Sequence, residues 1–466
     1  MPKTVLVFDF GASSARAMLC RCENGGFTLE EIHRFPNVPV TEDGHLRWDI
    51  DELWEQMRTA LSFGVFNGGF DAISIDTWGV DFGLIGQDGQ LLEKPVHYRD
   101  RRTEGMVEEV CGSIPAEELF MQSGIQPMSI NTLFQLNYLV KHEKNAIFRA
   151  EKLLMMPDLF AYFLTGECRS EFTEATTTQL IDQKTRGWNI RLIEALGLPK
   201  RIFAPLIQPG ERYGMLKQEL ADELRIDPVP VYACASHDTA SAVLAVPTQE
   251  EKFAFLSCGT WTLFGTELKR PVVTEQALNM GLTNEGGCGG TTTLLKNIMG
   301  LWMIQSVRHE VNDKYSFAEI CAMAEEAKDF PSRVDANDEC FLSPENMTEE
   351  VKDYCRRTGQ KVPETMGEIA TVIYTSLAEC YAKTAKELEE STGRTYSRIH
   401  VVGGGSNAGY LNELTAKATG KEVHAGPGEA TAIGNITAQM LKAGEFKSIE
   451  EARTTIHESF GIKIYK

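Results

Sequence analysis

The sequence predicts an α/β protein built from two large domains. Its 466 residues exceed what one ordinary hydrophobic core accommodates. The first half alternates apolar runs typical of buried strands with segments that have the periodicity of helices. The pattern breaks near Pro247 and then resumes, which predicts domains over residues 1–246 and 247–466.

Composition and charge narrow the class of protein further. With 46 Lys and Arg against 66 Asp and Glu, the net charge is −20, and no basic block is present that would neutralise nucleic-acid phosphates. A local basic site for one nucleotide remains compatible with this charge. No signal peptide and no apolar run long enough to cross a membrane is evident. We therefore expect a cytoplasmic protein that binds neither nucleic acid nor membrane.

The cysteines point to the same compartment. There are 11, an odd number, and none forms a CxxC pair or accompanies a histidine cluster. Reduced thiols packed as small apolar groups therefore fit better than a disulfide framework or a zinc site.

Local patterns predict the elements of the first domain. The run TVLVFDF (4–10) is continuous and apolar, and Gly11 closes it, as expected of a buried strand. A helix between Pro157 and Gly166 has proline at its start and glycine at its end. The remaining expectations are strands at 17–20, 71–76, 82–85 and 231–235 and a helix at 46–61.

The second domain shows the same alternation. Strands are expected at 253–257 and at 398–402, where the second strand runs into the triple glycine 403–405. Helices are expected at 408–419, ended by Gly420, and at 429–441.

The segment from Pro230 to Val243 carries the strongest chemical signal. Its strand is followed by Ser236, a plausible N-cap, and then by small residues that open a closely packed helix. Asp238 thus lies near a helix N-terminus, beside His237 and Thr239, where it is well placed to take a proton from a substrate hydroxyl. A carboxylate that only caps its helix explains the segment equally well when the segment is taken alone.

Two further segments resemble each other. DFGASSAR (9–16) and SCGTWTLFG (257–265) both place Gly and Ser or Thr between apolar strands, so each offers backbone N–H groups and hydroxyls that suit phosphate oxygens. Neither is a Walker A loop, and the glycines 403–405 are not GxGxxG, which argues against a Rossmann dehydrogenase. The turn VVGGGSNA instead suits a flat adenosine group lying on bare backbone, although a tight packing turn would look the same.

Taken together, these segments resemble the FGGY family of carbohydrate kinases. DFGASSAR matches the first phosphate hairpin of the family, SHDTASAV the segment of the catalytic aspartate, SCGTWTLFG the second hairpin and VVGGGSNA the adenosine segment. Further blocks are DTWGVDFGL (76–84), EATTTQL (174–180) and TNEGGCGG (283–290). The resemblance implies two actin-like ATPase (ribonuclease H-like) domains with a central cleft for nucleotide and sugar.

The implied reaction transfers the γ-phosphoryl group of ATP to the 1-hydroxyl of L-rhamnulose, with Asp238 as general base. By the family pattern, the sugar is bound by Gly79, His237, Asp238, Thr239 and Asn297. ATP is bound by Ala12, Ser13, Ser14, Ala15, Arg16, Thr260, Gln305 and Gly404. Asp9 is the candidate for orienting Mg²⁺ through water. The partners are then a small ketose and ATP, and the protein is a monomer or a small homo-oligomer.

Two other functions stay open, and the sequence departs from the family pattern in the first hairpin. A kinase of the same family for another ketose, such as L-fuculose or L-xylulose, fits nearly as well, and a partner-binding ATPase like actin or Hsp70 fits poorly because no residues remain for a peptide-binding region. Ala15 stands where the family hairpin usually has glycine, so the loop is expected to be slightly reshaped. Trp78 is either a wall of the sugar site or part of the core, and Asp81 and Asp100 either reach the sugar or form internal hydrogen bonds.

Overall fold

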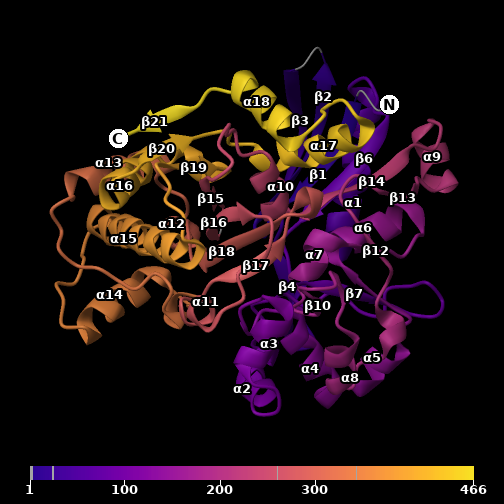
Figure 1. Ribbon diagram of the computed structural model, residues 1–466, viewed down its shortest axis with the longest axis horizontal. Coiled ribbons are helices and arrows are strands. Elements are labelled where there is room, and N and C mark those ends of the chain that lie inside the picture. The colour runs from indigo at the N-terminus through magenta and orange to yellow at the C-terminus, as the bar shows by residue number, and fades with distance from the viewer. Residues whose placement is uncertain (1–3, 24–25, 260, 343) are drawn as a thin grey trace. The chain divides into compact units, whose positions relative to one another are not determined.

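A computed structural model describes residues 4–23, 26–259, 261–342 and 344–466 (Figure 1). Two compact units make up these residues. The first contains residues 1–245, 268–293 and 431–459, and the second contains residues 246–267, 294–430 and 460–466. The chain therefore leaves the first unit after Ala245 and returns to it twice. The division at 246/247 into two contiguous FGGY domains stays a prediction.

The first unit is built on a mixed sheet with the strand order β13-β14-β6-β1-β2-β3. Its strands are β13 (Arg212–Met215), β14 (Pro230–His237), β6 (Ala72–Thr77), β1 (Thr4–Phe10), β2 (Ser14–Glu23) and β3 (Gly26–Pro36). The central strands β14, β6 and β1 run parallel, whereas β1, β2 and β3 form an antiparallel meander. Parallel strands are covered on both faces, which explains why β6 is buried along its whole length.

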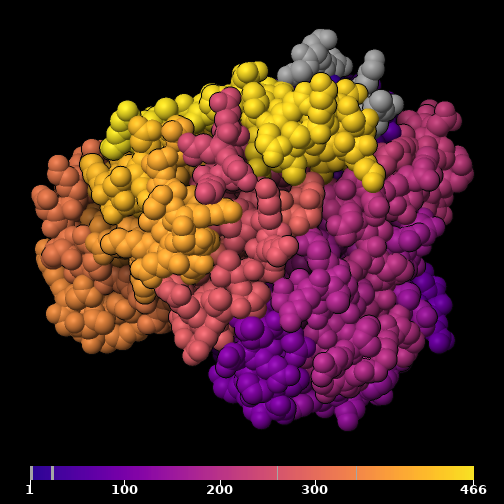
Figure 2. All heavy atoms as spheres, in the orientation of Figure 1, coloured from indigo at the N-terminus to yellow at the C-terminus, as the bar shows by residue number. Residues whose placement is uncertain are grey.

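Helices flank this sheet. They include α1 (Ile50–Phe66), α6 (Met156–Thr165), α7 (Phe172–Thr176), α10 (Asp238–Leu244), α17 (Ala430–Ala443) and α18 (Ile449–Ser459). The two helices from the late return segment belong to this unit: the ring of Phe446, between them, lies 5.7 Å from that of Phe27 on β3. Figure 2 shows their atoms (yellow) on the surface of the molecule.

A second apolar core of the first unit lies among shorter elements. They are β7 (Phe82–Ile85), α2 (Met106–Cys111), α3 (Ala116–Ser123), α4 (Thr132–His142), α5 (Lys144–Arg149), β8 (Lys152–Met155) and α8 (Ile190–Ala195). Leu133, Phe134 and Leu136 on α4 are fully buried in this core. Smaller strands of the unit are β4 (Pro39–Glu42), β5 (His45–Trp48), β9 (Ser170–Glu171), β12 (Leu206–Ile207) and β17 (Thr283–Gly286).

The second unit repeats the plan of a hairpin joined to parallel strands. Its strands follow the order β18 (Thr292–Ile298), β16 (Thr262–Leu268), β15 (Ala254–Cys258), β19 (Arg398–Val402), β20 (Glu422–Ala425) and β21 (Lys463–Tyr465). The β15–β16 pair is antiparallel, and β15, β19 and β20 run parallel. The larger helices are α12 (Trp302–Glu310), α13 (Phe317–Glu326), α14 (Met347–Arg357), α15 (Met366–Thr392) and α16 (Gly409–Thr419). The similarity of the two hairpin segments in the sequence thus reflects a repeated architecture.

The strands predicted at 4–10, 82–85 and 398–402 are confirmed residue for residue, and most other predicted elements are displaced by one or two residues. The helix predicted at 46–61 is wrong at its start, because residues 45–48 form β5, which pairs with β4, and the helix begins only at Ile50. In this stretch Trp48 is fully buried. The N-cap predicted at Ser236 is also wrong, because β14 continues to His237 and Ser236 hydrogen-bonds within the strand.

No helix within the described residues is both long enough and apolar enough to span a bilayer. All eleven cysteines are free thiols.

Candidate active site

Asp238 is the first residue of α10 and follows β14 directly. Because β14, β6 and β1 are parallel, their carboxyl ends meet at one edge of the sheet. Asp9 on β1 lies in register with Asp76 on β6, and His237 lies in register with Thr77. Three carboxylates, those of Asp9, Asp76 and Asp238, therefore end at this edge. The side chain of Asp238 is 32% exposed, so the carboxylate is open to a ligand.

Burial and a neighbouring carboxylate raise the pKa of two side chains at this edge, Asp76 and Asp238. Burial raises the pKa of Asp238 above its ordinary value, and repulsion by Asp9 adds to this effect, while His237 acts in the opposite direction. Burial and repulsion by Asp9 also raise the pKa of Asp76 well above its usual range. Asn435 on α17 donates to Oδ2 of Asp76 at 2.5 Å, and Oδ1 of Asp76 is buried without a partner among the described residues. The guanidinium of Arg16 forms an ion pair with Asp9 at 2.8 Å.

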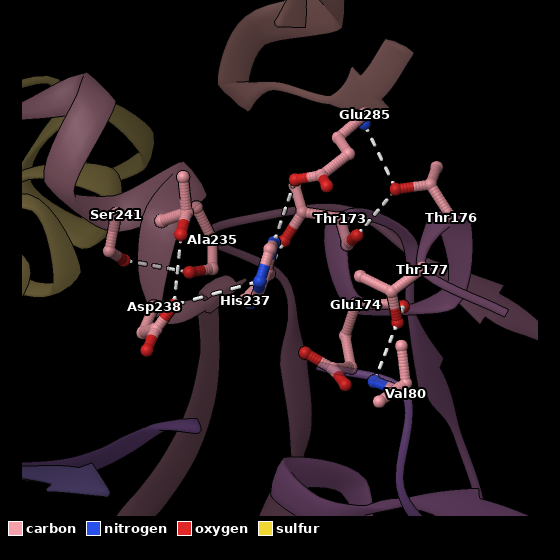
Figure 3. A network of polar contacts seen from close by, with 12 residues as sticks. Val80, Thr173, Glu174, Thr176, Thr177, Ala235, His237, Asp238, Ser241 and Glu285 are labelled. Carbon is pink, nitrogen blue, oxygen red and sulfur yellow. Dashed lines mark hydrogen bonds and ion pairs between the residues drawn. The ribbon is translucent and has the colours of Figure 1, made fainter. Parts of the chain in front are cut away.

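His237 lies between two carboxylates (Figure 3). Its Nδ1 is 3.2 Å from Oε2 of Glu285, and its Nε2 is 3.6 Å from Oδ1 of Asp238. Burial alone would lower the pKa of this histidine, but the negative charges of Glu285 and Asp238 outweigh burial and raise the pKa above its ordinary value. The two carboxylates therefore favour the charged form of the imidazole.

A buried carboxylate on the segment before α7 fixes the backbone that leads into Asp238. Glu171 accepts hydrogen bonds from the backbone N–H groups of Thr173 and Glu174 and so caps α7. It also accepts from the Thr173 hydroxyl at 2.6 Å and from the N–H of Ser236 at 3.1 Å. The N–H of His237 then donates to Oγ1 of Thr173 at 3.3 Å. This set of bonds ties the end of β14 to the start of α7.

The turn after β6 adjoins the same histidine. A Cβ atom on Gly79 would lie 3.0 Å from Cγ2 of Thr177 and 3.3 Å from Nε2 of His237, so only glycine leaves His237 free at this point. Val80 follows with a φ of 70°, a left-handed conformation that β-branched residues rarely adopt. Hydrogen bonds enforce it: the N–H of Val80 donates to Oγ1 of Thr177 at 3.0 Å, and its carbonyl accepts from the hydroxyl of Thr132 at 2.7 Å.

Glu174 on α7 lies beside this turn, and Figure 3 shows its carboxyl group on the side that faces Asp238. Its side chain is fully buried, and both carboxyl oxygens have no hydrogen-bond partner among the described residues. Burial, with repulsion by Asp158 and Glu171, raises the pKa of Glu174 well above its usual range. The buried site therefore favours the neutral form of this carboxyl group over its ionised form.

Three residues left open by the sequence form internal contacts. The buried carboxylate of Asp81 accepts from the indole N–H groups of Trp48 at 2.6 Å and Trp78 at 3.1 Å, and from the N–H of Tyr98. Trp78 is buried against Trp48, with ring centroids 4.1 Å apart. Asp100 caps a short helix and accepts from the N–H of Leu46. The contacts of Asp81, Trp78 and Asp100 therefore all lie within the first unit.

The residues predicted to bind phosphate, Ala12, Ser13, Ser14, Ala15 and Arg16, lie on the turn and first positions of the β1–β2 hairpin. The N–H of Gly11 donates to the carbonyl of Ser14 at 2.9 Å, and the side chain of Asn37 donates to the carbonyl of Gly11. Ser13 and Ser14 are exposed. Ala15 lies in the extended strand β2, opposite Phe10, and its own φ is not positive. An alanine therefore causes no backbone strain at this position, and the expected reshaping of the loop is not required.

The other predicted contacts belong to the second unit. Asn297 lies on β18, Gln305 on α12, and Gly404 in the turn after β19, while Thr260 lies outside the described residues. The glycines of this turn have a packing reason: a Cβ on Gly405 would lie 2.1 Å from Cβ of Cys258, and Gly403 has a φ of 78°. The turn therefore presents bare backbone against the β15–β16 hairpin.

Within the described residues, no cluster of three or more His, Cys, Asp or Glu side chains has the spacing of a metal-binding centre. The carboxylates of Asp9, Asp76 and Asp238 nevertheless suit a hard cation such as Mg²⁺, which prefers oxygen ligands and retains several waters. The unpartnered Oδ1 of Asp76 fits such a ligand set.

The fold and this site define a kinase, and the chain belongs to the FGGY family of carbohydrate kinases. The N-terminal domain of that family matches residues 4–245, and the C-terminal domain matches residues 254–443. Among solved structures, a ligand-bound xylulose kinase from Lactobacillus acidophilus has a TM-score of 0.79 at 16% identity, covering 99% of this chain and 93% of that one. The glycerol kinase of Plasmodium falciparum with ADP has a TM-score of 0.75 at 13% identity, covering 99% and 94%. The predicted two-domain α/β fold of this family is confirmed.

Among curated proteins, this chain is similar to rhamnulokinases along nearly its whole length. The rhamnulokinase of Oceanobacillus iheyensis is 42% identical over 100% of this chain and 98% of its own length. The rhamnulokinase of Bacillus subtilis is 40% identical over 98% and 94%, and that of Bacteroides thetaiotaomicron is 41% identical over 100% and 96%.

Sequence reasoning missed four acidic residues of this edge: Asp76, Glu171, Glu174 and Glu285. A signal existed for Asp76, because DAISID (71–76) ends a buried strand on aspartate as VLVFD (5–9) does. Glu174 and Glu285 fall inside blocks that carried the family resemblance, EATTTQL and TNEGG, but no spacing in the sequence joins either block to His237.

Proposed function

We propose that the protein transfers the γ-phosphoryl group of ATP to the 1-hydroxyl of L-rhamnulose, giving L-rhamnulose 1-phosphate. The likeness to rhamnulokinases at 40–42% identity over nearly the whole chain is the observation that carries the choice of sugar. The position of Asp238, partly exposed at the helix N-terminus and in reach of His237, supports its role as the general base.

In this proposal Asp238 accepts the proton of the 1-hydroxyl as the oxygen attacks the γ-phosphorus. Such transfers depend mainly on positioning and on stabilising charge, so the base only orients or deprotonates the acceptor. The sugar is bound by Gly79, His237, Asp238, Thr239 and Asn297. The Oγ1 of Thr239 donates to Asp238 at 3.0 Å, which holds the carboxylate toward the acceptor.

ATP contacts are assigned to residues 12–16 and to Thr260, Gln305 and Gly404. The hairpin N–H groups and the exposed hydroxyls of Ser13 and Ser14 suit phosphate oxygens. Asp9 would hold Mg²⁺ through water, and the ion would neutralise charge on the phosphates. We place the reaction in the cytoplasm, which the eleven free thiols support, and expect a monomer or small homo-oligomer.

The test is sugar-dependent release of ADP from Mg·ATP with L-rhamnulose, L-fuculose, L-xylulose, D-xylulose and glycerol in parallel. We expect the highest kcat/KM on L-rhamnulose, and a fall in kcat of about 10²–10⁴-fold in Asp238→Asn with a much smaller change in KM. Asp227→Asn is the matched control, since this exposed aspartate lies on the loop before β14.

Higher kcat/KM on another ketose would keep the kinase and replace the substrate. ADP release that ignores the sugar and survives in Asp238→Asn would reject the kinase in favour of a partner-binding ATPase.

A further inference from the structure

We propose that Thr177 is a positioning residue of the reaction: its hydroxyl holds the strained turn of residues 79–80 in the shape that presents the backbone of this turn to the ketose. This inference rests on the proposed function, in which Gly79 and His237 contact the sugar. Thr177 acts through the turn and is not itself placed in contact with the sugar.

The turn after β6 has a conformation that its own residues do not favour. The N–H of Asp81 donates to the carbonyl of Gly79 at 3.0 Å, and Val80 between them has a φ of 70°. A positive φ at the centre of such a three-residue turn belongs to the rare, strained form of the γ-turn. Because the central residue is β-branched, contacts outside the turn are needed to hold this shape.

The side chain of Thr177 contacts the turn with both of its branches. Its Oγ1 donates to the carbonyl of Glu174 at 2.8 Å and accepts the N–H of Val80 at 3.0 Å (Figure 3). A hydroxyl has one proton to donate, so these two bonds fix its orientation. Its Cγ2 lies 3.0 Å from the place that a Cβ on Gly79 would occupy. The hydroxyl therefore holds Val80, while the methyl group lies against Gly79.

Helix α4 holds the carbonyl of Val80. This carbonyl accepts from the hydroxyl of Thr132 at 2.7 Å and from Nε2 of Gln135 at 3.3 Å. Thr177, Thr132 and Gln135 are all buried, so water competes little for these bonds. Side chains from two helices thus fix both polar groups of the Val80 backbone, and the positive φ persists.

The turn adjoins the proposed base through one histidine. A Cβ on Gly79 would lie 3.3 Å from Nε2 of His237, and the same nitrogen is 3.6 Å from Oδ1 of Asp238. Gly79 and Val80 are half-buried. A ketose whose 1-hydroxyl lies at Asp238 is therefore within reach of the backbone of the turn. Holding that backbone in one shape before the sugar arrives lowers the cost of binding.

Thr177→Val keeps the methyl group and the shape of the side chain but removes the hydroxyl. The N–H of Val80 then loses its acceptor, and the turn should relax. We expect KM for L-rhamnulose to rise about tenfold, the effect of one lost hydrogen bond. Because the proposed base and the first hairpin are unchanged, kcat and KM for Mg·ATP should stay within about twofold. Thr177→Ser keeps the hydroxyl and should raise KM for L-rhamnulose by less than about threefold.

Thr178→Val is the matched control. The Thr178 hydroxyl also donates to a carbonyl of α7, that of Ala175 at 2.6 Å, and also accepts a backbone N–H, that of Leu180 at 3.0 Å. It is fully buried, so its removal should lower the urea midpoint as much as Thr177→Val does. KM for L-rhamnulose should nevertheless stay within about twofold of the wild type. Equal rises of KM in Thr177→Val and Thr178→Val would reduce Thr177 to a structural role, and equal rises in Thr177→Val and Thr177→Ser would overturn the role of its hydroxyl.

A double substitution tests whether Thr177 acts by holding a strained backbone. Glycine adopts a positive φ about as readily as a negative one, so the turn needs the Thr177 hydroxyl less when residue 80 is glycine. In a Val80→Gly background, Thr177→Val should raise KM for L-rhamnulose only about two- to threefold, against about tenfold in the wild-type background. An equally large rise in both backgrounds would overturn the inference.

A further readout does not depend on turnover. Hydrogen exchange at the N–H of Val80, followed by NMR on sugar-free protein, should be about tenfold faster in Thr177→Val than in the wild type and unchanged in Thr178→Val. An unchanged rate in Thr177→Val would refute the inference. A wild type that phosphorylates none of the five acceptors would refute the proposed function, while this exchange still decides whether Thr177 holds the turn. A wild type active on L-rhamnulose whose KM is unmoved in Thr177→Val would refute only the role of Thr177.

Discussion

Replacing Gly434 by alanine tests whether the packing behind α10 sets the position of Asp238, the proposed general base. Gly434 lies on α17, and a Cβ atom there would lie 1.8 Å from the carbonyl oxygen of Ser241 on α10, 2.5 Å from its carbonyl carbon and 3.0 Å from its Cα. All three are backbone atoms, so no side-chain rotation relieves the contact. An ordinary van der Waals contact requires about 3.4–4 Å, and the two helices must therefore separate.

The magnitude follows from two opposing effects. Extra atoms in a well-packed interior cost about 1–3 kcal/mol, and a clash with rigid backbone belongs at the upper end. Alanine has the better helix propensity by about 1 kcal/mol. We expect a net loss of about 2 kcal/mol in the free energy of unfolding. Since Asp238 begins α10, its displacement should also lower kcat, by roughly 10²-fold for a shift of 1 Å.

The assay is denaturant unfolding together with kcat and KM on L-rhamnulose. Gly409→Ala is the control, because Gly409 begins α16 and a Cβ there would make only ordinary contacts, 3.4 Å from the hydroxyl of Tyr465 and 4.0 Å from Nζ of Lys463. We expect this control to keep both stability and activity. A Gly434→Ala protein with wild-type stability and wild-type kcat would show that α10 does not depend on close contact with α17.

Three further substitutions test the surroundings of the site. Because burial holds the pKa of Glu174 above its ordinary 4.5, folding binds a proton and wild-type stability falls as pH rises above that value. Glu174→Gln should therefore gain stability relative to the wild type as the pH is raised from 4.5, as measured by urea unfolding, and a difference that does not change with pH would contradict a raised pKa of Glu174. Asp81→Asn should lose about 3 kcal/mol in the same measurement, because both carboxylate oxygens accept from donors and an amide has only one acceptor oxygen: its N–H₂ must face either the indoles of Trp48 and Trp78 or the side-chain amide of Gln135, and a neutral effect would contradict this. Val80→Gly should stay within about 1 kcal/mol of the wild type, because relief of its left-handed φ offsets the lost side chain, and a loss above about 2 kcal/mol would show that the turn is not strained.

Local signals in the sequence were sufficient for the elements that carry the site. The apolar run of β1 and its closing glycine fixed that strand, and the small residues after His237 predicted the helix that packs closely on Gly434. Where local signals predicted the wrong secondary structure, pairing with another strand determined the structure that forms. Leu46 fits the helical period that continues through Ile50 and Leu53, yet residues 45–48 pair with β4, and such a pairing partner is not visible in the residues themselves.

The full set of residues in the site was harder to predict from the sequence. Asp238 and His237 were found because they are adjacent and follow an apolar strand, and their predicted roles remain to be tested. Glu285 lies 48 residues farther along the chain, and Asn435 contacts Asp76 across 359 positions. Such partners come together only through the return of the chain to the first unit, which no local pattern encodes.

That return has a consequence for how the protein is made. Arg453 on α18 donates to the carbonyl of Val243 on α10 across 210 positions, and α17 closes over the same helix. At about 5–20 residues per second, a ribosome needs roughly 10–40 s to bridge that interval. During this time the residues of α10 that are buried in the finished enzyme have no α17 or α18 to cover them. Helix α10 therefore completes its packing late in synthesis, and this interval is when a nascent chain of this protein most needs protection from aggregation.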